Sequence, residues 1–92
     1  MSEGIDFETV WERILDGERA FFRTHQGVLF TYRVHDGFVH PSHSDQAIPK
    51  HDFETVFPLL PVRPPQKIAK HVAAYPYVWA ILHDGRISRG DW

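Results

Sequence analysis

The chain has 92 residues, of which 42% are hydrophobic and 24% charged, and it contains no cysteine. That apolar fraction is too high for a disordered chain, and so short a chain buries only one core, so we expect a single small domain spanning residues 1–92. The absence of cysteine excludes disulfides, thiolate metal sites and a cysteine nucleophile, and the formal charge of −2 argues against a strong non-specific nucleic-acid binder.

No stretch of the sequence has the pattern of a targeting or membrane segment. The N-terminal region carries Glu3, Asp6, Glu8 and Glu12 and lacks the uninterrupted apolar run of a secretory leader. No segment approaches the roughly 20 apolar residues that a membrane-spanning helix needs. We therefore expect a cytoplasmic protein with no membrane partner.

Residues 5–17 predict the first helix. Asp6 is a favourable N-cap, and Gly17 is expected to end the helix in the left-handed conformation. Apolar side chains recur between them at helical spacing, at Phe7, Val10, Trp11, Ile14 and Leu15.

Residues 19–41 predict three antiparallel strands. The first covers residues 19–24, and the loop at 25–27 has the three-residue form, ending in glycine, that closes a hairpin with a bulge. This loop pairs Thr24 with Val28. Asp36-Gly37 then supplies the dipeptide of a type I′ turn, which closes a second hairpin and sets Val34 opposite Val39 and Arg33 opposite His40.

In this register the sheet has two faces of different composition, because directly opposed residues point the same way. The core face holds Ala20, Phe22, Val28, Phe30, Tyr32, Val34 and Val39. The other face, called the outer face below, holds Arg19, Phe21, Arg23, Leu29, Thr31, Arg33, His35, Phe38 and His40.

The second half of the chain predicts helices. A polar loop at residues 42–46 precedes a helix that starts at Pro49 or just beyond it and ends or kinks at Pro58. Residues 58–65 form a stiff connector with Leu59 and Leu60 buried. A third helix is expected from Pro65 through Ala73.

Tyr75-Pro76 is expected to break that helix, and residues 77–84 are apolar nearly all round, which indicates a buried fourth helix that Gly85 ends. Residues 86–92 are expected to be a frayed or docked tail, with Trp92 as a reason to dock. The predicted fold class is α+β, with a three-stranded antiparallel meander packed with one N-terminal helix and two to three C-terminal helices, in the order α-β-β-β-α-α-α. The expected core adds Trp11, Ile14, Phe53, Val56, Val78, Trp79 and Leu82 to the sheet residues.

The outer face is the main candidate for function. Arginines can contact phosphates while phenylalanines stack on bases, which is the combination that readers of RNA and single strands use. The candidate binding residues are Arg19, Phe21, Arg23, Arg33, His35, Phe38 and His40. The same composition is also typical of an ordinary half-solvated sheet face. The leading interpretation is a small non-enzymatic binding or adaptor module whose partner is nucleic acid or another protein.

A homo-oligomeric or protein-interaction module with no nucleic-acid role is the alternative, because the chain has more large apolar residues than so small an interior can hide. Phe21, Leu29 and Phe38 would form an exposed patch rimmed by Arg and His, through which two copies could join as a C₂ dimer. Since imidazole titrates near pH ~6.5, such a dimer is expected to weaken in mild acid.

Metal binding and catalysis are not expected. The stretch from His40 to His51 holds His40, His43, Asp45 and His51, which are transition-metal ligand types, but Pro41 and Ser42 make it a loop without the spacing of a helical His-x-x-His pair. His-Asp pairs at 35–36, 51–52 and 83–84 each have a local structural role, and no nucleophile elbow is present. We therefore expect no enzyme activity, no cofactor and no metal site.

Overall fold

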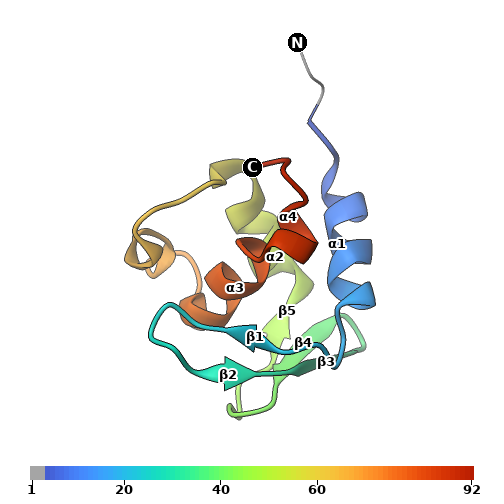
Figure 1. Ribbon diagram of the computed structural model, residues 1–92, viewed down its shortest axis with the longest axis vertical. Coiled ribbons are helices and arrows are strands. Elements are labelled where there is room, and N and C mark those ends of the chain that lie inside the picture. The colour runs from blue at the N-terminus through green and yellow to red at the C-terminus, as the bar shows by residue number, and fades with distance from the viewer. Residues whose placement is uncertain (1–3) are drawn as a thin grey trace.

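The computed structural model describes residues 4–92, and its order of elements confirms the α+β class. Figure 1 shows the strands gathered at one end of the molecule, with the helices above them and the η2 loop on the side opposite α1. The elements are α1 Phe7–Asp16, β1 Phe22–Arg23, β2 Leu29–Phe30, β3 Tyr32–His35, β4 Phe38–Pro41, β5 Ile48–Pro49, α2 Lys50–Val56, the 3₁₀ helices η1 Phe57–Leu59 and η2 Pro65–Ile68, α3 Tyr75–Leu82 and α4 Gly85–Ser88.

Helix α1 begins as predicted and ends differently. The Asp6 carboxylate accepts hydrogen bonds from the backbone N–H and the hydroxyl of Thr9, at 2.9 and 2.7 Å, which is the expected N-cap. Gly17 has φ −85°, so the expected left-handed conformation is wrong at this position, and Arg19 adopts it instead at φ +70°. Leu15, expected on the buried stripe, is 38% exposed because the stripe that meets the core is narrower.

Both predicted hairpins form in the predicted register. The Thr24 N–H donates to the Val28 carbonyl at 2.9 Å, and Arg33 and Val34 pair with His40 and Val39. Both turn residues of the second hairpin have positive φ, as a type I′ turn requires, with Asp36 at +52° and Gly37 at +78°.

The meander is built from other strands than those expected. The long middle strand is interrupted at Thr31, so that β2 pairs with β1 in a two-stranded sheet while β3 pairs with β4 in a second sheet. The third strand of that second sheet is β5, which lies where a loop and helix start were expected. Ile48 explains it, because this side chain is 1% exposed and reaches the core by pairing beside Val39.

The core lies between the inner faces of the two sheets and the helices. Phe22, Phe30, Tyr32 and Val39 are buried as predicted, whereas Val34 is half-buried. The helices contribute Val10, Trp11, Ile14, Phe53, Val56, Val78, Ile81, Leu82 and Ile87. Trp79, expected in the core, is half-buried and packs at its edge.

The expected third helix is wrong beyond its first turn. Pro65 does begin a helical segment, but η2 stops at Ile68 and the chain continues through turns to α3. Ile68, Val72 and Ala74 are all buried, and a short isolated helix is only marginally stable without such anchors. The chain therefore follows the contacts of these side chains rather than the helical pattern. Tyr75 and Pro76 form the first turn of α3 instead of breaking a helix.

The connector is held by its backbone. The N–H of Val62 donates to His83 Nε2 at 3.1 Å, and the Val62 carbonyl accepts from Trp79 Nε1 at 2.7 Å. Val62 is buried, whereas Leu59 is exposed and Leu60 half-buried, so burial of the two leucines is wrong. Trp79 of α3 and His83 at its C-cap thus fasten the connector to the helix.

Residues 86–92 dock on the domain. Asp84 caps α4 by accepting from the Arg86 N–H at 2.9 Å, so Gly85 starts a helix and does not end one. The Arg13 side chain donates to the carbonyl of Ile87 at 2.9 Å and pairs with Asp91 at 2.8 Å. Trp92 Nε1 donates to the Leu82 carbonyl at 2.6 Å. The C-terminal segment is therefore tied to both α1 and α3.

Candidate binding surface

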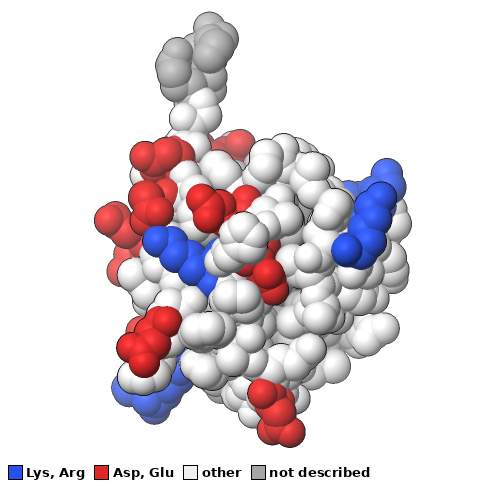
Figure 2. Space-filling model, turned by 180° about the vertical axis from the view of Figure 1, so that it is seen from behind, with Lys and Arg blue, Asp and Glu red and all other residues white. Residues whose placement is uncertain are grey.

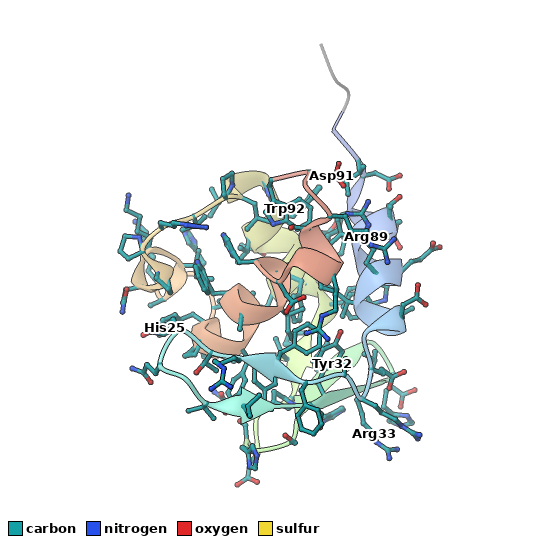
Figure 3. All side chains as sticks on the ribbon, in the orientation of Figure 1. His25, Tyr32, Arg33, Arg89, Asp91 and Trp92 are labelled. Carbon is teal, nitrogen blue, oxygen red and sulfur yellow. The ribbon has the colours of Figure 1, made fainter. Side chains whose placement is uncertain are left out.

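The outer face of the sheets is solvent-exposed. Every one of its residues is exposed except Thr31, which is half-buried. Phe21 is 66% exposed, Leu29 46% and Phe38 40%, although these side chains are apolar. Val28, expected on the core face, is 44% exposed because it lies at the end of the hairpin beyond the helices. Figure 3 shows Arg33 pointing away from the body of the protein, while its neighbour Tyr32 points inward.

The strand register divides the outer face into two clusters. Arg23 lies beside Leu29, and extending the β1–β2 pairing places Phe21 opposite Thr31. On the other sheet, Arg33 pairs with His40 and His35 with Phe38. Because a strand rises about 3.3 Å per residue, Phe21 and Phe38 are separated by about 13 Å along the strands. The seven candidate residues share one side of the molecule, but its apolar members do not form one continuous patch.

The outer face carries positive charge without a carboxylate of its own. Within residues 4–92, neither Arg19, Arg23 nor Arg33 takes part in a salt bridge. Arg23 is partly engaged, since it donates to the carbonyl of Gly27 at 3.0 Å. The carboxylate of Asp36 at the turn lies 3.2 Å from His35, and both side chains are exposed. Three guanidinium groups therefore remain available to an anionic partner.

Local backbone contacts hold these residues in place. The N–H of Arg19 donates to the carbonyl of Tyr32 at 3.2 Å, which ties the end of α1 to β3. Glu18 accepts from the N–H of Val34 at 2.9 Å on the same strand. The buried Tyr32 hydroxyl donates to the Ile14 carbonyl at 2.6 Å, and burial raises the pKa of this phenol. The outer face is thus tied to α1 and to the segment that follows it.

Arg86 supports the surface from behind, a role that the sequence did not reveal. Its guanidinium binds both oxygens of Asp84, at 2.8 and 2.9 Å, and these hydrogen bonds lower the pKa of the Asp84 carboxyl. It also donates to the carbonyl of Phe21 at 2.6 Å and lies 4.4 Å from the centre of the Phe22 ring. The local sequence Asp84-Gly85-Arg86 is the only signal for this role, and its glycine predicts a helix end instead.

The histidine-rich loop does not bring its expected ligand types together. Across residues 4–92, the structure contains no group of three or more His, Asp or Glu side chains placed to hold a metal ion. His51 contacts Thr55 at 3.4 Å and lies 4.0 Å from Glu54, within its own helix.

Within residues 4–92, none of the helices has the length and apolarity needed to cross a membrane.

The His83-Asp84 pair is engaged in local structure. His83 Nδ1 lies 3.1 Å from the Trp79 carbonyl and its Nε2 accepts from Val62, which defines a neutral ring. Burial is the main cause that lowers the pKa of His83. Asp84 caps α4 and binds Arg86.

Comparison with protein-family models, curated proteins and solved structures finds no significant match to this chain. The residues of the outer face therefore carry the functional argument on their own chemistry.

Proposed function

We propose that this protein is a non-enzymatic binding module whose outer face contacts single-stranded nucleic acid. The observation that supports this most is the exposure of Arg19, Arg23 and Arg33 beside exposed Phe21 and Phe38, with no carboxylate among the outer-face residues. Guanidinium groups bind phosphates, and exposed aromatic rings stack on unpaired bases at about 1–3 kcal/mol per base. The positions of Phe21 and Phe38, about 13 Å apart along the strands, suit bases that are not adjacent along an extended nucleic-acid strand.

Binding of a labelled single-stranded oligonucleotide, measured by fluorescence anisotropy over a salt series, tests this proposal. Affinity is expected to fall as salt is raised. Arg33→Ala is expected to remove about one phosphate contact, so the plot of log K against log salt should become less steep by about 0.7. Phe21→Ala is expected to weaken binding while leaving that slope unchanged, because stacking releases no counterions.

Arg89→Asn is the matched control, because Arg89 is an exposed arginine outside the outer face and asparagine tolerates its left-handed backbone at φ +48°. It removes the same charge and is expected to leave affinity nearly unchanged. The proposal is wrong if anisotropy does not change at high protein concentration and low salt, or if Arg89→Asn weakens binding as much as Arg33→Ala.

A second candidate function is C₂ self-association through the same surface. It is favoured by the concentration of exposed apolar side chains on one hairpin, where Phe21, Val28 and Leu29 are all more than 40% exposed. Such a patch, with arginines around it, has the composition of an interface core and rim. Light scattering over a range of concentrations at pH ~7.5 and ~5.5 tests it, because histidine side chains lie beside the arginines of this surface.

Phe21→Ser is expected to make such a dimer monomeric. A dimer that persists equally at both pH values would retain the interface and remove the role of the histidines. A monomer at both pH values would leave nucleic acid or a different protein as the partner of the outer face.

A further inference from the structure

Helix α1 presents an acidic stripe to solvent. Glu8, Glu12 and Asp16 follow one another at intervals of four residues, and all three side chains are exposed. Glu8 pairs with Lys50 at 3.1 Å, so Glu12 and Asp16 are the carboxylates of this stripe that take part in no salt bridge within residues 4–92. Residues at this spacing lie above one another on a helix, with about 6 Å between successive positions. Leu15 lies three residues after Glu12 on the same side and is 38% exposed. The acidic stripe therefore includes one exposed leucine.

The opposite side of the molecule carries a basic groove. A hollow of about 750 Å³ is formed by residues 59–71, around η2. Its cationic lining residues are Arg63, Lys67, Lys70 and His71, and the apolar part of its lining includes Leu59, Val62 and Ile68. Leu59 is 45% exposed. The groove is thus a concave surface with an aliphatic floor and a positive rim.

No negative charge offsets this groove within its own segment. The sequence contains no Asp or Glu between Glu54 and Asp84. None of Arg63, Lys67 and Lys70 takes part in a salt bridge within residues 4–92, in contrast to Arg13, which pairs with Asp91. Figure 2 shows acidic side chains gathered mainly over the α1 side, where some basic side chains also lie, and basic side chains without acidic neighbours at the opposite edge, where the η2 loop lies.

We propose that the basic groove binds the acidic stripe of a second copy of this chain. The groove requires an anionic partner with an aliphatic side chain, and the stripe supplies both: carboxylates for the lysines and Leu15 for the floor beside Leu59. The groove has no Phe, Tyr or Trp in its lining, so His71 is its only aromatic ring on which a base could stack, and its apolar floor suits an aliphatic side chain better.

This contact is head-to-tail. Because the stripe and the groove lie on opposite sides of the molecule, a pair of copies leaves one groove and one stripe free. A third copy can then add by the same contact, so association is open-ended and its extent rises with concentration. The outer face plays no part in this contact and remains accessible along such a chain of copies.

Charge reversal provides the test, with weight-average mass measured by sedimentation or light scattering as a function of concentration. The wild-type mass is expected to rise with concentration in about 0.05 M salt and to fall back toward the monomer in about 0.3 M salt, where the Debye length is shorter. The variants Glu12→Lys/Asp16→Lys and Lys67→Glu/Lys70→Glu are each expected to remain monomeric, because each then has two surfaces of like charge.

An equal mixture of these two variants is expected to regain association, because every stripe then meets a groove of opposite charge. Arg19→Glu/Arg33→Glu changes the net charge as much as Lys67→Glu/Lys70→Glu but lies on the outer face, so it should associate as the wild type does. Loss of association in this variant would assign the contact to the outer face and overturn the proposal. Circular dichroism verifies that each variant is folded. A wild-type protein that stays monomeric in low salt, a groove variant that still associates, or a mixture that stays monomeric would each overturn the proposal.

Discussion

Gly17 lies at the end of α1, where the backbone passes directly over two aromatic side chains of the core. A Cβ atom placed on Gly17 would lie 2.6 Å from the Tyr32 hydroxyl and 3.3 Å from Cζ of Phe22. Tyr32 cannot move away easily, since it is 1% exposed and its hydroxyl donates to the Ile14 carbonyl at 2.6 Å. The backbone itself has φ −85°, which alanine adopts without strain.

Two effects of opposite sign therefore compete in Gly17→Ala. Replacing glycine where the backbone is compatible stabilises a protein by about 0.4–1 kcal/mol, because the unfolded chain loses conformational freedom. Overpacking a rigid core costs about 1–3 kcal/mol. The contact with the Tyr32 hydroxyl is too short to be relieved by a small movement of that side chain, which is buried and hydrogen-bonded. The steric cost should therefore exceed the entropic gain, with a net loss of about 1–2 kcal/mol in the free energy of unfolding.

A double-mutant cycle identifies the cause. Tyr32→Phe alone should cost about 0.5–1.5 kcal/mol through its lost hydrogen bond. Gly17→Ala/Tyr32→Phe should cost less than the sum of the single changes, because the atom that clashes with the new Cβ is gone. Urea unfolding monitored by tryptophan fluorescence measures all four proteins. If Gly17→Ala is neutral or stabilising, or if the two changes are simply additive, the steric explanation is refuted.

Three further changes test the contacts between the connector, the helices and the C-terminal segment. Trp79→Ala should lower the free energy of unfolding by about 2–4 kcal/mol, somewhat less than for a fully buried tryptophan, and a barely shifted urea midpoint would contradict the packing described for its ring. The depressed pKa of His83 means that the unfolded chain binds a proton at a higher pH than the folded one. Stability should therefore decrease as pH falls below the ordinary histidine value of 6.5, and His83→Gln should flatten thermal unfolding temperatures between pH ~7.5 and ~5.5; an equally steep dependence in the variant would assign the effect to other groups. Arg13→Ala should cost about 1.5–3 kcal/mol and increase hydrogen exchange in residues 85–92, because Arg13 is 12% exposed and its partners lose a charged donor. Asp91→Asn, which leaves the carbonyl contacts of Arg13 in place, should cost less than half as much.

Local chemistry accounts for what could be predicted from the sequence. Asp6 caps α1 because its carboxylate reaches an N–H only three residues away, and Asp36-Gly37 closes a hairpin because both residues tolerate positive φ. The turn then sets the register, and the alternation of side chains assigns the arginines and Phe21 to the outer face. Each of these inferences depends on interactions within a few residues, which is why the faces and the exposed candidate residues could be named in advance.

Long-range packing decided the rest. Ile48 pairs as β5 because Val39 offers it a position beside the core, and nothing in its own neighbourhood indicates a strand. The predicted helix after Pro65 gives way to a short 3₁₀ turn because burial of Ile68 and Val72 outweighs a weak local preference.

The two charged surfaces on opposite sides of the molecule show the same division. The sequence by itself determined that the segment after Glu54 is basic and that α1 is acidic on its exposed side. Only the tertiary structure decided that the basic residues surround a groove and that the groove lies opposite the helix, with the C-terminal residues bound to Arg13 instead of trailing into solvent. The physical reason is that propensity, capping and alternation act over a few residues, whereas the direction in which separate segments face is set by which apolar side chains share a single core.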